Sequence, residues 1–456
     1  MKGGSVVERE EVFRVIEANN ITSVAAQFVD FLGKLYTLWV SPSELPTGLE
    51  DGFGISGWPY FTDVEKSDIL LKPDLSSFRI LPWTREGRGY AGVMCDVCHP
   101  DTHEEIEESP RALLKRALRR VKEVVGKDVN ILAVPECEFF LLVRSDGGEW
   151  RLHDNASYFS PPPADKGYEI RDDIVNALNT MGIHVTKHHH EDPRGKHELN
   201  IEHDVALNSA DKIQFVKWII RKVASENGVT ATFMPKPFDW EYGAGWHTHV
   251  SLVDEVTGAN LFYSDKAESG LSECCLFFLA GVLNHARALT AITNPTVNSY
   301  KRMIPGSQAP VYVAWSKYNR SALLRVPASS PQGTRFEYRP SDGACNIYLS
   351  LAALVHAGLD GLEKRELPPP EVSENIYQLT PEERTSRNIG TLPGSLHEAL
   401  EALKRDATIM HALDPLTPKY IAWRSAEWRE YSDKVYDWER EKYLEEEFPL
   451  EYLKHQ

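Results

Sequence analysis

The sequence predicts an α+β protein, and three features of its pattern lead to this fold class. The first hundred residues hold short strand-like runs broken by turns, strand and helix signals alternate from residue 129 onward, and the chain is helical and highly charged from Gly394 to its end. This pattern indicates an α+β fold in which a sheet carries the chemistry. At 456 residues the chain exceeds the usual size of one hydrophobic core, so we expect more than one domain.

The N-terminal region predicts one helix followed by four strands. We expect the helix over residues 6–19 and the strands over residues 23–29, 35–40, 69–71 and 78–81. A polar stretch over residues 99–107 then leads into a helix that begins at Pro110, so we place the domains at residues 1–105 and 106–456.

The larger region predicts a mixture of strands and long helices. Strands are expected over residues 129–134, 139–143, 230–234 and 247–252. Helices are expected over residues 170–181, 209–226, 272–293 and 348–362. In the helix from Pro110, we expect the cations at helical spacing to form a solvent-facing side: Arg111, Lys115, Arg119 and Lys122.

Composition excludes several classes of protein. The net charge of −17 argues against a nucleic-acid binder, although an acidic site can still bind ATP through divalent cations. Residues 1–13 lack the apolar core of a signal peptide, and the longest apolar run, residues 274–283, is too short to span a bilayer. We therefore expect a cytoplasmic protein without a membrane partner.

Two short motifs match known signatures without the context that those signatures need. Cys95 and Cys98 have the spacing of a haem-attachment motif, but their apolar stretch indicates two thiols buried in a strand. Gly52, Gly54 and Gly57 match the dinucleotide-binding fingerprint, which requires a preceding strand and a following helix. Neither neighbour fits here, so we interpret these glycines as a loop.

Paired carboxylates in an apolar segment are the first indication of chemistry. Glu136 and Glu138 lie between two apolar runs, and residues two apart on a strand point to the same face. Two like charges on an apolar face are costly unless a cation lies between them. The alternative is an edge strand with a solvated face, which the apolar flanks disfavour.

Three further segments repeat this logic with histidines, arginines and glutamates. His247 and His249 share one face of a predicted strand, although such histidines are often hydrogen-bonded core residues. Arg335, Glu337 and Arg339 share another face, which suits a bound carboxylate or phosphate, or alternatively a solvated edge.

Glu191 and Glu198 belong to the last of these segments. They would meet across the turn at Pro193 and Gly195, after a histidine run that could also be a surface feature. The four segments together supply five glutamates and a histidine, a donor set that suits Mg²⁺ or Mn²⁺. Two such ions with nearby arginines form a phosphoryl-transfer site for an ATP-like substrate.

The segments that carry these residues resemble the glutamine synthetase family over nearly the whole chain. The matching motifs begin at these residues and run in the same order: Pro135 (PECEFF), His188 (HHHE), Gly195 (GKHE), Thr230 (TATFMPKP), Gly243 (GAGWHTHVS), Asn294 (NPTVNSYKR), Asn319 (NRSA) and Arg335 (RFEYR). The resemblance implies a β-grasp-like N-terminal domain and a catalytic domain with an antiparallel sheet flanked by helices. It also implies a homo-oligomer, a hexamer or a dodecamer of two stacked rings, with active sites between subunits.

By position, the resemblance also implies a role for each matching residue. Glu138, Glu191 and Glu198 would hold a first metal ion, and Glu136, His247 and Glu337 a second. The residues implied to contact the nucleotide are His249, Ser251, Arg325 and Arg335. The substrate carboxylates and the transferred phosphate would meet Arg302, Arg320 and Arg339, with Gly243 in the glutamate loop. Asp51 would reach into the neighbouring subunit's site and help to deprotonate ammonium.

The implied reaction has two steps and consumes ATP. ATP phosphorylates the γ-carboxylate of glutamate, and an amine then displaces phosphate from the acyl phosphate. The amine must first lose a proton, so an anionic group beside it is needed.

Two departures from the family motifs lie on the substrate side of the site. The family's flap reads Pro-Gly-Xaa-Glu-Ala-Pro, whereas Gln308 replaces the glutamate here and cannot act as a base. Tyr242 replaces an asparagine of the glutamate loop and would reshape the pocket.

These departures favour an ATP-dependent glutamate ligase whose acceptor is an amine other than ammonia. True glutamine synthesis is the alternative, and the acid could also be an analogue of glutamate. A non-catalytic family member, structural or regulatory, stays open but leaves the complete ligand set unexplained. A guanidino-phosphotransferase, with a related sheet, is a further alternative.

Overall fold

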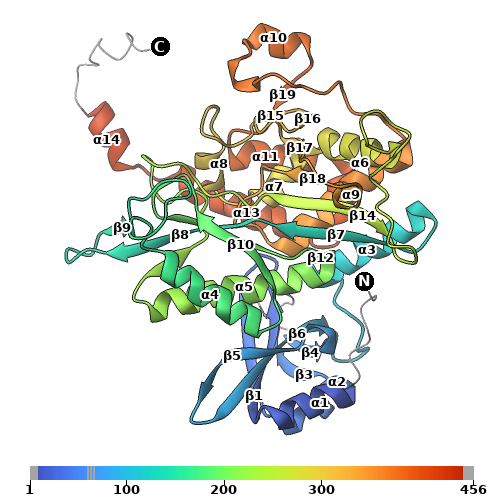
Figure 1. The fold of residues 1–456 in the computed structure, drawn as a ribbon, viewed down its shortest axis with the longest axis vertical. Coiled ribbons are helices and arrows are strands. Elements are labelled where there is room, and N and C mark those ends of the chain that lie inside the picture. The colour runs from blue at the N-terminus through green and yellow to red at the C-terminus, as the bar shows by residue number, and fades with distance from the viewer. Residues whose placement is uncertain (1–8, 59–60, 62–63, 65–66, 445–456) are drawn as a thin grey trace.

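The computed structural model describes residues 9–58, 61, 64 and 67–444. A small N-terminal sheet lies at one end of the molecule, and the larger helix-rich part holds the rest of the chain (Figure 1). No single helix in these ranges is both long and apolar enough to cross a membrane, and one bent pair, α6 and α7, meets that test only when its two helices are counted together by length and composition.

The N-terminal sheet has six strands in the order β2-β1-β6-β4-β3, with β5 paired to β6. Its elements are α1 (Arg9–Ala18), β1 (Ile21–Val29), β2 (Leu35–Val40), α2 (Leu45–Glu50), β3 (Phe53–Ser56), β4 (Asp68–Pro73), β5 (Arg79–Arg85) and β6 (Arg88–Cys98). The pairing of β1 with β6 is parallel, and the other strand pairings of this sheet are antiparallel. The four predicted strands are confirmed, one with the predicted bounds and the other three longer, and the part of the first predicted helix before residue 9 lies outside the described residues.

One prediction for this region is wrong and one is confirmed. Residues 53–56 form β3, an edge strand paired to β4, instead of the expected loop. Gly52 explains the turn into this strand, because its φ of +81° is a conformation that favours glycine. Cys95 and Cys98 are buried free thiols in β6, as expected.

Two sheets form the centre of the larger part. One has the order β10-β11-β8-β13, with β9 paired to β8, and the other has the order β12-β7-β14-β18-β17-β16. Their strands are β7 (Val129–Pro135), β8 (Cys137–Arg144), β9 (Trp150–Leu152), β10 (Val185–His190), β11 (Lys196–Ile201), β12 (Asp204–Val205), β13 (Thr230–Thr232), β14 (Thr248–Asp254), β16 (Trp315–Lys317), β17 (Leu324–Val326) and β18 (Phe336–Tyr338). A small two-stranded sheet pairs β15 (Tyr312–Val313) with β19 (Gly390–Thr391).

Helices surround these sheets. They are α3 (Pro110–Val125), α4 (Tyr168–Thr180), α5 (Ala206–Glu226), α6 (Glu273–Asn284), α7 (Ala286–Thr293), α8 (Ser299–Arg302), α9 (Ile347–Lys364), α10 (Pro381–Ser386), α11 (Leu396–Lys404), α12 (Ala407–Ala412), α13 (Thr417–Ser432) and α14 (Asp437–Tyr443). Among the described residues, the largest hydrophobic cluster joins most of these helices, but not α10 or α14, to both sheets, whereas a second cluster fills the N-terminal sheet.

Two helix predictions need correction. The single helix expected over residues 272–293 is two helices, α6 and α7, that meet at His285 with a bend of 74°. Arg111 of α3 does not face solvent, because its side chain is 5% exposed and forms ion pairs with Asp74, Asp96 and Asp211. Helical spacing alone could not identify these buried partners, since they come from β6, from α5 and from the turn after β4.

Candidate active site

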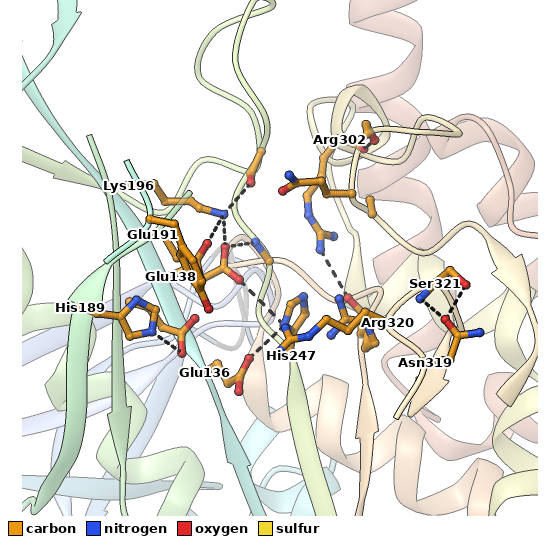
Figure 2. A pocket seen from close by; sticks show the side chains of 18 of the residues that line it. Glu136, Glu138, His189, Glu191, Lys196, His247, Arg302, Asn319, Arg320 and Ser321 are labelled. Atoms are coloured by element: carbon orange, nitrogen blue, oxygen red, sulfur yellow. Dashed lines mark hydrogen bonds and ion pairs between the residues drawn. The ribbon is translucent and has the colours of Figure 1, made fainter. Parts of the chain in front are cut away.

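Most of the predicted metal ligands and substrate-binding residues line one cavity between the two central sheets. The cavity has a volume of about 1320 Å³ and contains most of the carboxylates named above. Figure 2 shows Glu138 and Glu191 on one side of it and Arg302 and Arg320 on the other. The chain passes from one sheet to the other between β7 and β8, at Glu136.

Strand register brings the first group of ligands together. His189 of β10 pairs with Glu198 of β11, and Glu198 pairs with Glu138 of β8. Residues directly opposite each other on neighbouring strands lie on the same face. These three side chains therefore form a row across the sheet, and Lys196 shares their face because it lies two residues before Glu198 on β11.

A second row crosses the other sheet. Arg325 of β17 pairs with Glu337 of β18, which pairs with His249 of β14. Phe336 and Tyr338 point to the opposite face and are fully buried, as the alternation predicted. His247 precedes β14, and its Nδ1 lies 3.0 Å from Glu136 and 3.5 Å from Glu337.

Two groups of side chains can hold a metal ion at this site. Glu136, His247 and Glu337 each offer a ligand atom within 4.8 Å of the others, and His189, Glu191 and Glu198 do the same. The first group is the predicted second-metal set. The other contains His189 where the resemblance implied Glu138. Each offers one imidazole nitrogen and carboxylate oxygens, a donor set that fits Mg²⁺ or Mn²⁺.

The charges around these carboxylates shift their pKa values. Burial opposes ionisation of Glu138, but Lys196 and His247 outweigh it and lower the pKa of this carboxyl to about 2. Burial likewise opposes ionisation of Glu337, whereas Arg339 and His247 lower its pKa to about 2. Both side chains are therefore anionic at neutral pH, as metal ligands must be.

Glu191 is shifted in the opposite direction. Burial raises the pKa of Glu191, Lys196 opposes this shift, and the nearby carboxylates of Glu138 and Glu198 add to it. A cation beside Glu191 would relieve this repulsion.

The predicted arginines lie around the carboxylates in two ways. Arg325 and Arg339 both donate to Glu337, so these cations also hold a predicted ligand in place. Arg302 donates to the backbone oxygen of Pro340 and is buried at the cavity wall, whereas Arg320 lines the cavity and is exposed.

Three of the four predicted nucleotide contacts gather in an adjoining pocket of about 460 Å³, and Arg325 is not among the described residues that line this pocket. It is lined by His249, Ser251 and Arg335, and it shares Glu136 with the central cavity. Arg335 donates from Nε to His249 Nδ1 over 3.1 Å, and His249 Nε2 lies 3.1 Å from Glu136. Glu136 therefore connects the metal group to this second pocket.

The remaining predicted residues separate into those at the cavity and those away from it. Gly243 and Gln308 line the cavity, and Gln308 donates from Nε2 to Asp192 over 2.9 Å. Tyr242 and Asp51 are both exposed and are not among the described lining residues. Asp51 ends α2 in the N-terminal sheet, so its predicted role depends on a neighbouring subunit.

Several cavity residues were not selected by the sequence analysis. His189 and Lys196 carry polar groups into the carboxylate cluster, and Tyr158 and Phe159 line the cavity beside His189. The period of two along strands could have identified His189 and Lys196, because each lies two residues before a selected glutamate. Tyr158 and Phe159 lie in a loop, where no periodicity identifies them.

Comparisons with known proteins agree with this architecture. The family model for the β-grasp domain of glutamine synthetase matches residues 20–100, and that for its catalytic domain matches residues 107–443. The chain is 43% identical to glutamine synthetase of Thermus thermophilus, over 96% of this chain and 98% of that protein. It is 42% identical to glutamine synthetase of Thermotoga maritima, over 95% of this chain and 99% of that protein.

Solved structures show the same relationship. A structure described as a GmaS/ADP complex superposes with a TM-score of 0.85 at 31% identity, and covers 94% of this chain and 98% of that one. Glutamine synthetase of Plasmodium falciparum superposes with a TM-score of 0.84 at 26% identity, and the match covers 97% of this chain and 100% of that one. The α+β fold prediction is confirmed, and the chain belongs to the glutamine synthetase family of ATP-dependent, carbon–nitrogen bond-forming ligases.

Proposed function

We propose that this ligase activates the γ-carboxylate of glutamate with ATP and transfers it to an amine other than ammonia. The observation that carries the proposal is the combination of two complete ligand groups with a neutral Gln308 at the acceptor side of the cavity. The family's ATP and divalent-metal dependence would serve the first step, and the altered flap would change the second.

In the first step, a carboxylate oxygen of glutamate attacks the γ-phosphorus of ATP and ADP leaves. Two divalent ions, Mg²⁺ or Mn²⁺, would neutralise the negative charge of the phosphates when bound. Glu136, His247 and Glu337 would hold one ion. Arg320 and Arg339 would stabilise the charge on the moving phosphoryl group, and Arg302 would bind a substrate carboxylate.

In the second step, the amine nitrogen attacks the acyl carbon and phosphate leaves. The attacking nitrogen must give up a proton, and Gln308 has no group that can accept it. Asp51 of a neighbouring subunit would then be the acceptor, in a ring-shaped hexamer or dodecamer. An amine with an organic substituent would use the open, aromatic mouth of the cavity at Tyr158 and Phe159.

Glutamine synthesis is the second candidate, with ammonium as the acceptor. Identity above 40% over nearly full length with glutamine synthetases of two other organisms favours it. Under this alternative, Gln308 and Tyr242 are tolerated variation.

The test measures phosphate release with ATP, glutamate and either Mg²⁺ or Mn²⁺, across ammonium and a panel of alkyl, polyamine and aromatic amines. Products are identified by mass. A γ-glutamyl amide formed with one amine at several times the rate of glutamine is the expected result. Glutamine as the best product would replace the proposal with the second candidate, and no ATP turnover with any acceptor would favour a non-catalytic role.

A further inference from the structure

Lys196 is a buried cation inside the predicted first metal site. Its Nζ lies 2.8 Å from Glu138 Oε2, 3.3 Å from the backbone oxygen of Gly243 and 3.7 Å from Glu191 Oε2. The side chain is only 5% exposed. An ammonium has three protons, and two of them find hydrogen-bond acceptors on Glu138 and Gly243, while Glu191 lies within ion-pair distance.

One of the two carboxylate oxygens of Glu138 is therefore already occupied by hydrogen bonds. Oε2 accepts hydrogen bonds from Lys196 and from the backbone N–H of Gly245 at 2.9 Å. The other oxygen, Oε1, lies 3.9 Å from His247 Nδ1 and so faces the group of Glu136, His247 and Glu337. Glu138 therefore directs its second oxygen toward the second-metal group.

His189 is oriented as a metal ligand on the other side of Glu198. Its Nδ1 lies 3.1 Å from the backbone oxygen of His190, a pure acceptor, so Nδ1 carries the proton. In the neutral ring the lone pair is then on Nε2, which lies 3.4 Å from Glu198 Oε1. The ring centroids of Tyr158 and Phe159 lie 5.7 and 4.7 Å from that of His189, and this packing fixes the plane of the imidazole.

We propose that the first divalent cation in this chain is held by His189, Glu191 and Glu198, and that the Lys196 ammonium replaces this cation beside Glu138. Two cations repel each other at such short range, so the metal ion must lie on the side of Glu191 and Glu198 that is away from Lys196. His189 is the ligand on that side. The inference rests on the metal-dependent function proposed above and deepens it.

This arrangement has a consequence for the choice of metal. Each of the two groups would hold its ion with one imidazole and two carboxylates. Imidazole suits first-row transition ions, whereas Mg²⁺ prefers oxygen. The site therefore favours Mn²⁺ over Mg²⁺ more strongly than a site with three carboxylates would.

Electron spin-echo spectroscopy of bound Mn²⁺ tests the ligand set directly, because imidazole nitrogen gives a ¹⁴N modulation. The experiment uses the full-length, nucleotide-free protein as the His247→Asn variant. We expect the modulation to persist in this variant and to disappear in His247→Asn/His189→Asn. It should also persist in His247→Asn/His188→Asn, because His188 lies on the opposite face of β10 and contacts Arg171. Loss of the modulation in His247→Asn alone would overturn the proposal.

A Mn²⁺ titration by calorimetry tests the role of Lys196. Lys196→Gln removes the competing charge but keeps a donor for Glu138, so we expect Mn²⁺ to bind about tenfold more tightly. Lys187→Gln is the matched control, because this lysine is 3.6 Å from Glu198 but its side chain is 59% exposed, and it should change the affinity less than threefold. Equal effects of the two substitutions, or weaker binding in Lys196→Gln, would overturn the proposal.

Both measurements are independent of the acceptor. They use no ATP, glutamate or amine, so a failed search for an amide product leaves them interpretable. Conversely, if the first metal ion proves to be held by the three glutamates that the resemblance implied, the identity of the product is unaffected.

Discussion

Glu337 is held by more charged partners than any other described carboxylate of the candidate site. Arg325 and Arg339 donate to it, and His247 lies 3.5 Å away. Glu337→Gln removes a proposed metal ligand, and we expect ATP-dependent turnover to fall by about 100-fold or more. Phosphate release measures turnover, and size-exclusion chromatography checks that the oligomer stays assembled. Glu149→Gln, an exposed position, is the control, and equal turnover in both variants would remove the metal assignment.

Gln308 allows a second prediction at the scale of single residues. Its amide donates to Asp192, so a glutamate at position 308 would place two carboxylates together. Repulsion between them would raise the pKa of both carboxyl groups, so the new glutamate would carry less negative charge. With ammonium as acceptor, we expect Gln308→Glu/Asp192→Asn to turn over about two- to fivefold faster than Gln308→Glu. Equal rates would show that Asp192 does not influence the flap.

Periodicity in the sequence identified the predicted ligands but not their grouping. The spacing of two was enough to put Glu136 and Glu138, or Glu337 and Arg339, on shared faces. Which strand lies beside which depends on register across 50 or more residues, as in the pairing of Glu138 with Glu198. Local pattern carries no such information, so it could not show that His189 meets Glu198 or that Lys196 meets Glu138.

At the scale of elements, the break between α6 and α7 is the clearest failure of local pattern. Residues 272–293 are apolar enough for one helix, but His285 interrupts it by bonding to two other elements. Its Nδ1 lies 2.7 Å from Asp406, before α12, and its Nε2 lies 3.0 Å from Asp360 of α9. Those partners are 75 and 121 residues away in sequence, beyond any window of periodicity.

The same histidine predicts a pH dependence of stability. Burial opposes protonation, but Asp406 and Asp360 raise the pKa of His285 above its usual value. A raised folded-state pKa stabilises the protein fully below the unfolded value of about 6.5, and this stabilisation is lost as pH rises through the folded value. Lys364 and Thr408 also face Asp360 and moderate the effect.

We therefore expect His285→Gln to destabilise the protein by about 1 to 3 kcal/mol near pH 6 and by less at alkaline pH. Thermal unfolding across pH measures the difference. His411→Gln is the control, because that side chain is 84% exposed beside Asp414. A loss that is constant with pH would mean that His285 acts by packing alone.

The crossing of α6 and α9 gives another prediction at this scale. A Cβ on Gly361 would lie 2.0 Å from the backbone oxygen of Phe277, and one on Gly281 would lie 2.1 Å from that of Ala357. Alanine favours a helix by about 1 kcal/mol, but backbone clashes in a packed core cost about 1 to 3 kcal/mol or more. We expect Gly361→Ala to lower the melting temperature, whereas Gly390→Ala, with open space around it, should not. A higher melting temperature in Gly361→Ala would show that the helices can separate at little cost.

For the whole molecule, the division into domains at residue 105 stays a prediction, although the class of fold is confirmed. Composition and length were sufficient to expect more than one domain, because a chain of 456 residues cannot form one compact core. They could not predict how the N-terminal sheet and the larger part are held together. Apolar residues of the N-terminal region such as Phe31 and Met94 join the core of the larger part, and Arg111, which the sequence analysis assigned to solvent, adds a charged connection.

Arg111 is the centre of this connection. It lies in α3, and its guanidinium binds Asp74 and Asp96 of the N-terminal region and Asp211 of α5. Tyr348 of α9 also donates to Asp211, so four segments meet at one cation. Removing a buried cation leaves its carboxylates unpaired in a low dielectric, which costs about 3 to 5 kcal/mol.

We therefore expect Arg111→Met to lower the free energy of unfolding by that amount and to make the N-terminal sheet unfold before the larger part. Scanning calorimetry would show an earlier, broader or divided transition, and exchange of backbone amides would increase first in β1 and β6. Arg120→Met is the matched control on the same helix, because its pair with Glu363 is about half exposed and worth at most about 1 kcal/mol. If the two substitutions lower the free energy of unfolding equally, water solvates the carboxylates around position 111 once the guanidinium is gone. In that case packing alone holds the N-terminal sheet to the larger part.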